Sequence, residues 1–178
     1  MVGRICRAAG LAAMLLVLGA PLSGSADPHV PLTASTALQG GLLDQVNALR
    51  AQHGLPRLRA SQELAAAATA HSLQMARLGY FSHNSANGAS FSQRIARFYP
   101  LGGYRSWSVG ENLLWSSPNV GASRALRMWL ASPPHRANLL SPRWRQIGLG
   151  AIHSPSAPGV YRGSAATIVT ADFGVRTR

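Results

Sequence analysis

The order of periodic segments along the chain restricts the fold more than any other feature. Leu42, Val46 and Leu49 recur at helical spacing and predict an early helix. Residues 145–154 and 163–174 are strand-like and predict a terminal antiparallel hairpin. Further segments have helical patterns (60–83, 90–98 and 121–132) or extended character (105–115). This order predicts an α+β fold in which helices cover a small antiparallel sheet.

Three residues within these segments carry specific packing expectations. His71 lies on the inward stripe of the helix predicted over 60–83, so we expect a hydrogen-bonded core histidine rather than a ligand. Gly148 and Gly150 lie in "IGLGAI", and no helix follows them, which argues against a dinucleotide-binding loop. We expect both glycines to relieve crowding within a strand.

The first 26 residues have the three-part form of a secretory signal peptide. Arg4 and Arg7 form a basic head, residues 11–18 are apolar, and small residues lead to a cleavage site near Ala26. The apolar run is too short for a permanent membrane-spanning helix. We therefore expect a secreted protein, extracellular or periplasmic, that is not an integral membrane protein.

The mature chain is expected to comprise a leader and one domain. Residues 27–38 are rich in Pro, Thr, Ser and Ala and predict a flexible leader, so the folded domain is assigned to 39–178. The only cysteine, Cys6, lies in the removed segment. No disulfide can therefore support the mature domain, and its stability must come from packing.

The chain is strongly basic. It has 17 basic residues, all of them arginine, and five acidic residues, and removal of the signal peptide lowers the net charge from +12 to about +10. Outside a cell, the anionic partners of such a protein are wall polymers, lipopolysaccharide or lipid headgroups. The arginines are scattered and no nucleic-acid-reading motif is present, so we expect no nucleic-acid partner.

Few carboxylates are available for chemistry. Asp27 lies in the leader, and Asp44 and Glu63 lie near helix starts, where they complement the helix dipole. Glu111 and Asp172 remain. Glu111 lies between apolar residues in "VGENLLW", where a buried carboxylate needs partners.

Two histidines in constrained settings are the natural partners of Glu111. His83 occurs in "GYFSHN", and His135 follows two prolines in "SPPHRAN". Pro133 and Pro134 fix their own φ angles and restrict the residues before them. We expect these prolines to end the fourth helix, so that His135 can face His83 and Glu111 across a cleft.

Several motifs resemble, in order, those of the bacterial branch of the CAP superfamily. They are "GYFSH", "GENLLW", "SPPHRANLLSPRWRQIGLG" and "VTADFG", and "NALRAQHGLPRL" and "HSLQMA" also look like the first two helices of the family. The superfamily includes cysteine-rich secretory proteins, antigen 5 and plant pathogenesis-related proteins. The resemblance covers roughly residues 40–175. It implies an α-β-α sandwich with a central antiparallel sheet, a concave surface cleft and secretion.

The resemblance also implies a site. Many family members line the cleft with two histidines and two acidic residues, and some bind a divalent metal there. His83, Glu111 and His135 match three of the four. The second acid would fall around residues 129–132, yet "MWLASPP" contains no carboxylate. Two imidazoles and one carboxylate can hold Zn²⁺ with an open fourth position. The alternative is a hydrogen-bonded cluster that pins three loops together.

Two amides accompany these residues, and no nucleophile is evident. We expect Asn112 and Asn138 to bond backbone groups in the loops that position Glu111 and His135. Ser82 lies beside His83, but no oriented acid is available to activate it.

Three functional hypotheses follow. We favour a secreted, non-catalytic CAP-like binding domain whose cleft, built around His83, Glu111 and His135, binds an unidentified extracellular, wall or lipid ligand. The alternative is a zinc-dependent hydrolase that acts on peptides or cell-wall material. An extracellular cationic effector is the third hypothesis, and it rests on charge alone.

Overall fold

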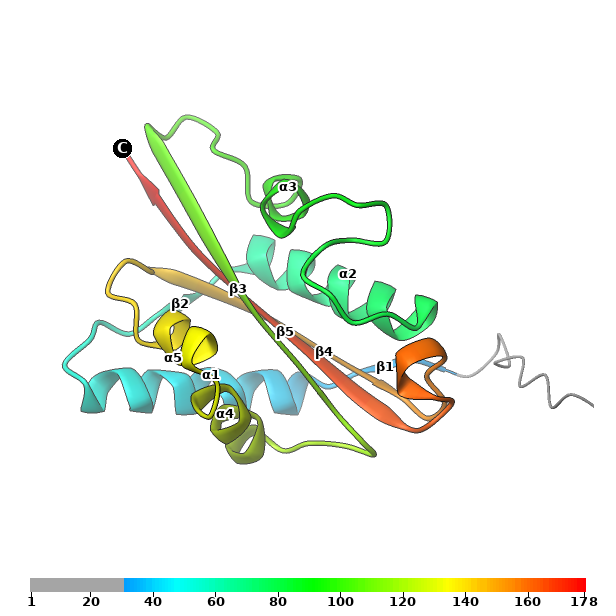
Figure 1. The fold of residues 1–178 in the computed structure, drawn as a ribbon. Coiled ribbons are helices and arrows are strands. Elements are labelled where there is room, and N and C mark those ends of the chain that lie inside the picture. The colour runs from blue at the N-terminus through cyan, green and yellow to red at the C-terminus, as the bar shows by residue number, and fades with distance from the viewer. Residues whose placement is uncertain (1–30) are drawn as a thin grey trace, which may run out of the picture.

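The chain folds into one sheet that lies between two groups of helices (Figure 1). The computed structural model describes residues 31–178. Among them, the sheet has the strand order β1-β4-β5-β3, and β2 pairs with β4. β2 runs parallel to β4, and the other pairs are antiparallel. The strands are β1 (Thr33–Ala34), β2 (Arg59–Ala60), β3 (Ser106–Ser116), β4 (Gln146–Ser154) and β5 (Ala166–Thr177).

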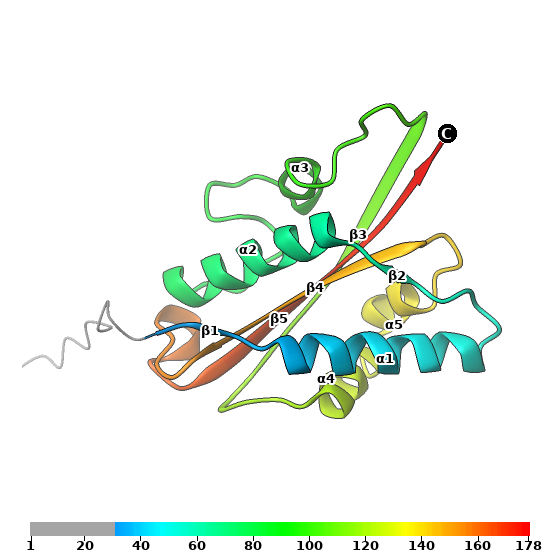
Figure 2. The same ribbon diagram turned by 180° about the vertical axis from the view of Figure 1, so that it is seen from behind.

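Helices cover both faces of the sheet, as the reverse view also shows (Figure 2). α1, α4 and α5 lie on one face, and α2 and α3 lie on the other. The predicted α+β fold and its α-β-α sandwich are confirmed. No helix within residues 31–178 combines the length and apolar character needed to cross a membrane. The helices are α1 (Thr36–Gln52), α2 (Gln62–Leu78), α3 (Phe91–Ala96), α4 (Ala122–Leu130) and α5 (Pro133–Leu139).

Alternation along the strands separates the core into two layers. Successive side chains of a strand point to opposite faces, so every second residue of β4 and β5 faces α1, α4 and α5. That layer joins the apolar side chains of these helices in the largest hydrophobic cluster. Its residues from β4 and β5 are Ile147, Leu149, Ala151, Val169, Ala171 and Phe173, and β3 adds Leu114.

α2 lies directly on β4 because neither surface has bulky side chains at the contact. A Cβ atom at Gly148 would lie 2.0 Å from the backbone nitrogen of Ala65. One at Gly150 would lie 2.4 Å from the carbonyl carbon of Ala68. Both distances are far below van der Waals contact, so the two glycines relieve crowding, but against the backbone of α2 rather than within the strand as predicted. The small residues of both elements set the separation of α2 from the sheet.

A Gly150→Ala substitution tests this packing. We expect it to lower the free energy of unfolding by about 2 kcal/mol, because the added methyl group forces α2 away from β4. Gly40→Ala is the matched control, since Gly40 lies within α1 and a Cβ there meets no atom within 4 Å. The control should raise the stability by about 0.5–1 kcal/mol. Urea unfolding measures both values, and similar effects at the two sites would contradict the proposed contact.

The start of the folded domain differs from the prediction. The expected signal peptide, residues 1–26, lies outside the described residues. The flexible leader predicted over 27–38 is wrong for residues 33–38. Thr33 and Ala34 pair with β4 as an additional strand, and α1 begins at Thr36. The hydroxyl of Ser35 caps α1 by accepting a hydrogen bond from the Leu38 amide at 3.4 Å.

Candidate functional site

Glu111 lies near the middle of β3, which is the edge strand of the sheet. Strand alternation directs its side chain to the face that α2 and α3 cover, together with Val109 and Leu113. Asn112 points to the opposite face, toward α5. The Glu111 side chain is fully buried. A buried carboxylate is stable only with partners, and the structure supplies them from two other segments.

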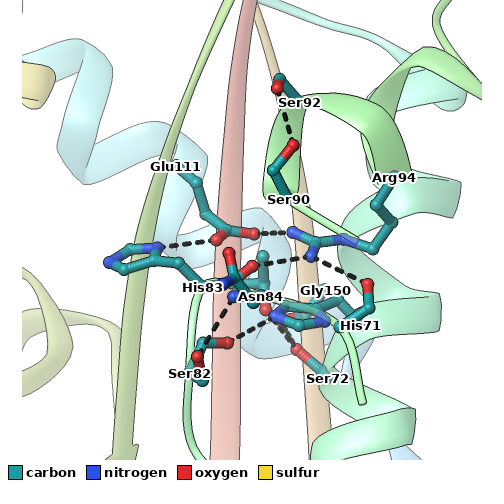
Figure 3. A network of polar contacts seen from close by, with 12 residues as sticks. His71, Ser72, Ser82, His83, Asn84, Ser90, Ser92, Arg94, Glu111 and Gly150 are labelled. Carbon is teal, nitrogen blue, oxygen red and sulfur yellow. Dashed lines mark hydrogen bonds and ion pairs between the residues drawn. The ribbon is translucent and has the colours of Figure 1, made fainter. Parts of the chain in front are cut away.

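Both oxygens of the Glu111 carboxylate are engaged (Figure 3). The Nδ1 atom of His83 donates to Oε1 at 2.7 Å. The guanidinium of Arg94 donates to Oε2 and forms a buried ion pair. His83 is therefore held through one ring nitrogen, while half of its side chain is exposed. The carboxylate fixes the orientation of the exposed imidazole.

Arg94 is a site residue that the sequence analysis missed. It belongs to α3, whose start is fixed by a capping box of Ser90 and Gln93. Besides Glu111, its guanidinium donates to the backbone oxygen of His83 at 2.9 Å. One side chain therefore joins α3 and β3 to the loop that carries His83.

A second carboxyl group lies beside Glu111. Asp172 is its direct partner in the β3–β5 register and has no exposed surface. Its oxygens accept no hydrogen bond from other described residues. Burial above all, and then the negative charge of Glu111, raise the pKa of Asp172 well above its ordinary value. Asp172 is thus stable in this position as a neutral acid, in which form its hydroxyl can donate to Glu111.

His71 lies behind this cluster on α2. It is fully buried, and its Nε2 atom donates to the backbone oxygen of Ser82 at 2.9 Å. Burial, and then the positive charge of Arg94, lower the pKa of His71 to about 4, although the negative charge of Glu111 partly offsets them. His71 is therefore a neutral core histidine that anchors the loop before His83, as predicted.

His135 reaches the site from the opposite face, on α5. The two prolines do follow the end of α4, but they also occupy the first positions of α5, where their missing N–H groups cost nothing. His135 is partly buried within the first turn of α5. Burial, and then the nearby His83, lower the pKa of His135.

Two amides tie α5 to β3. Asn112 donates from Nδ2 to the backbone oxygen of His135 at 3.0 Å. Asn138 donates to the backbone oxygen of Glu111 at 3.1 Å and to Oδ1 of Asn112 at 3.0 Å. The structure thus places both asparagines in contact with the segments that carry Glu111 and His135. His83 and the α5 segment that carries His135 therefore lie on opposite faces of β3.

The donor set does not fit the divalent-metal site that the family resemblance implied, or the zinc centre expected from its ligand types. Within residues 31–178, no three His, Cys, Asp or Glu side chains converge closely enough to hold a metal ion, so His83, Glu111 and His135 do not form a ligand group. Glu111 already binds His83 and Arg94 through its two oxygens. The guanidinium of Arg94 also places a positive charge where a dication would have to bind.

Comparison with known proteins identifies relatives of this fold. The model of the family described as "CAP: Cysteine-rich secretory protein family" matches residues 43–173. The chain is 32% identical over 115 residues to the "Uncharacterized membrane protein YlbC" of Bacillus subtilis, covering 65% of this chain and 32% of that protein.

Solved structures resemble it as well. A crystal structure of an extracellular protein containing an SCP domain from Bacillus anthracis has 28% sequence identity and a TM-score of 0.60, with 80% of this chain and 41% of that chain covered. An outer surface protein from Borrelia burgdorferi has a TM-score of 0.66 at 19% identity, with coverage of 83% and 99%. The chain thus matches less than half the length of YlbC and of the B. anthracis protein.

Proposed function

Since the chain belongs to the cysteine-rich secretory protein (CAP) family, we propose that it is an exported binding domain that performs no catalysis of its own. Its ligand is a wall or membrane component met outside the cytoplasm. The binding surface is the edge of β3, where His83 and the α5 segment that carries His135 lie on either side of the strand.

The state of Glu111 carries this proposal. A zinc hydrolase needs its carboxylate as a metal ligand, or as a base with a free lone pair that faces substrate. Glu111 is instead fully buried, and both of its oxygens bind cationic or N–H groups of the protein. It acts as a structural anchor that holds His83, and it does not reach the surface.

The imidazole of His83 has the properties of a binding group. Its Nδ1 atom is held by Glu111, and half of the side chain is exposed, so Nε2 is available to a ligand. A pre-oriented side chain loses little conformational entropy on binding, which favours affinity. His135 adds a second imidazole, and its lowered pKa favours the neutral form, which both donates and accepts hydrogen bonds.

Export is supported by two lines of argument. The N-terminal 26 residues have the pattern of a signal peptide. The related Bacillus anthracis protein is described as extracellular. The net charge of about +10 that remains after removal of the signal peptide also favours association with anionic wall polymers or lipid headgroups.

Retention of the protein on isolated cell walls and on anionic liposomes tests the proposal. His83→Ala and His135→Ala should each weaken retention about five- to tenfold, because each removes about one hydrogen bond to the ligand. His53→Ala is the matched control, since His53 is an exposed histidine at the end of α1. Unfolding midpoints of all three variants show whether the fold is kept.

Two results would overturn the proposal. In the first, the His83 and control variants bind equally well. In the second, the wild-type protein releases soluble fragments from cell walls in the presence of Zn²⁺, and His83→Ala loses that release. The second result would favour the hydrolase.

A further inference from the structure

A separate pocket lies where β3 and β5 extend beyond the start of β4. Residues 175–177 of β5 pair with residues 106–108 of β3, whereas β4 pairs with β5 only as far as Gly174. The loop before β4 lies beside this two-stranded end. Together they line an open pocket of about 590 Å³, which we call the arginine pocket. None of the site residues described above belongs to its lining.

Three arginines line the arginine pocket, and only one of them is neutralised. Arg176 forms an ion pair with Glu63 and lies over the ring of Tyr99 at 3.8 Å. Arg143 and Arg145 are exposed, and neither forms an ion pair within residues 31–178. The pocket therefore carries two uncompensated positive charges.

The two free guanidinium groups are held in place by contacts with their own loop and with β3. The Nη1 atom of Arg145 donates to the backbone oxygens of Pro142 at 2.6 Å and Trp144 at 3.0 Å. The guanidinium of Arg143 lies 5.7 Å from the centre of the Trp144 ring and contacts the Ser108 hydroxyl at 3.5 Å. Each guanidinium has five N–H donors, so both keep donors for a ligand.

We propose that the arginine pocket binds a phosphomonoester carried on a sugar or polyol. A phosphomonoester carries nearly two negative charges at neutral pH, which matches the two free arginines, and guanidinium groups pair with phosphate in a bidentate manner. The hydroxyls of Ser106, Ser108 and Thr177 also line the pocket and can bond the hydroxyls of a sugar. A volume of about 590 Å³ suits a ligand of that size.

Isothermal titration of the full chain with glucose 1-phosphate at low salt tests the proposal. We expect a dissociation constant on the order of 1 mM or tighter, and no binding of glucose. The double variant Arg143→Gln with Arg145→Gln should bind at least about tenfold more weakly. Arg124→Gln with Arg127→Gln removes the same charge from the exposed face of α4 and should change affinity less than about twofold.

Further measurements identify the source of the phosphate, and a single variant replaces the double variant if the latter does not fold. Phosphatidylcholine vesicles with phosphatidic acid present the same phosphomonoester on a lipid. Vesicle binding that depends on Arg143 assigns the pocket to a headgroup, whereas binding of glucose 1-phosphate alone assigns it to a soluble saccharide. If the double variant fails to fold, Arg143→Gln alone suffices, because among the described residues the only hydrogen bond of its guanidinium is the 3.5 Å contact with Ser108.

Two outcomes would overturn the proposal. One is that neither the sugar phosphate nor the vesicles bind. The other is that the α4 control weakens binding as much as the pocket variant does. His83→Ala should leave phosphate binding unchanged, so failure of the arginine pocket and failure of the histidine surface are separate results.

Discussion

Replacement of Arg94 by methionine is expected to lower the free energy of unfolding by about 4 kcal/mol, the cost of leaving one partner of a buried ion pair alone. Glu111 would lose its ion pair and keep the hydrogen bond from His83, inside a site with no solvent access. The adjacent Asp172 is a neutral acid and supplies no positive charge in place of the guanidinium. Urea unfolding at neutral pH measures the loss.

Two further variants show whether the buried charge is the cause. Arg97→Met changes an exposed arginine just after α3 and should alter stability by less than about 0.5 kcal/mol. Adding Glu111→Gln to Arg94→Met removes the unpaired charge, so the double variant should be more stable than Arg94→Met alone. If Arg94→Met itself lies within about 1 kcal/mol of the wild type, the ion pair does not hold this site together.

Arg94 bears on the proposed binding surface because it and Glu111 hold the same residue. Arg94 binds the backbone oxygen of His83, and Glu111 binds its ring. The buried pair therefore fixes both the loop and the exposed imidazole, without contributing a group to the surface. The contacts of the Glu111 carboxylate are all internal, so it is not placed to react with a group at the surface.

Local patterns predicted most elements of the fold but not all of them. Helical spacing and strand alternation are properties of adjacent residues, and they located α1 to α4, β3 and the β4–β5 hairpin. α5 was missed, because Pro133 and Pro134 were expected to end the helical segment and instead occupy the first positions of a new helix. The absence of a helix after Gly148 and Gly150 excluded a dinucleotide-binding loop, but their contact with α2 was not predicted. The strand at Thr33–Ala34 was missed because two residues are too few to show an alternating pattern. Only their pairing with β4 makes them a strand.

The contacts of the site depend on segments that are distant in sequence, and they were only partly predictable. Burial of Glu111 was deducible from its apolar neighbours in β3. Arg94 could not be identified as a site residue, because nothing in the sequence distinguishes an arginine in a short polar helix from a solvent-exposed one. Asp172 had a detectable signal, since it occupies an inward position in a buried strand. Its place beside Glu111 depends on the β3–β5 register, which the sequence does not specify.

Acid should destabilise the protein through His71, by about 3 kcal/mol between pH 7 and pH 4. The pKa of this imidazole falls from 6.5 to about 4 in the folded chain. Below pH 6.5 the unfolded state therefore binds a proton that the folded state excludes, and 2.5 pKa units correspond to about 3 kcal/mol. The contribution is fully present above pH 6.5 and is lost as the pH falls toward 4.

The opposite behaviour of Asp172 allows the two groups to be separated. Its raised pKa stabilises the fold at low pH, and that contribution is lost as the pH rises above the ordinary value of 3.8. Asp172 therefore cannot produce a loss of stability on acidification.

His71→Gln removes the titrating ring and keeps an N–H donor for Ser82, so urea unfolding of this variant should show a much smaller loss between pH 7 and pH 4. His53→Gln, at an exposed histidine, should keep the full loss. If His71→Gln shows the same pH dependence as the wild type, the acid sensitivity arises elsewhere. The charges of Arg94, Glu111 and His83 also shift the pKa of this ring. A smaller pH dependence in His71→Gln would therefore show that His71 belongs to the same group of interacting charges that orients the exposed imidazole of His83.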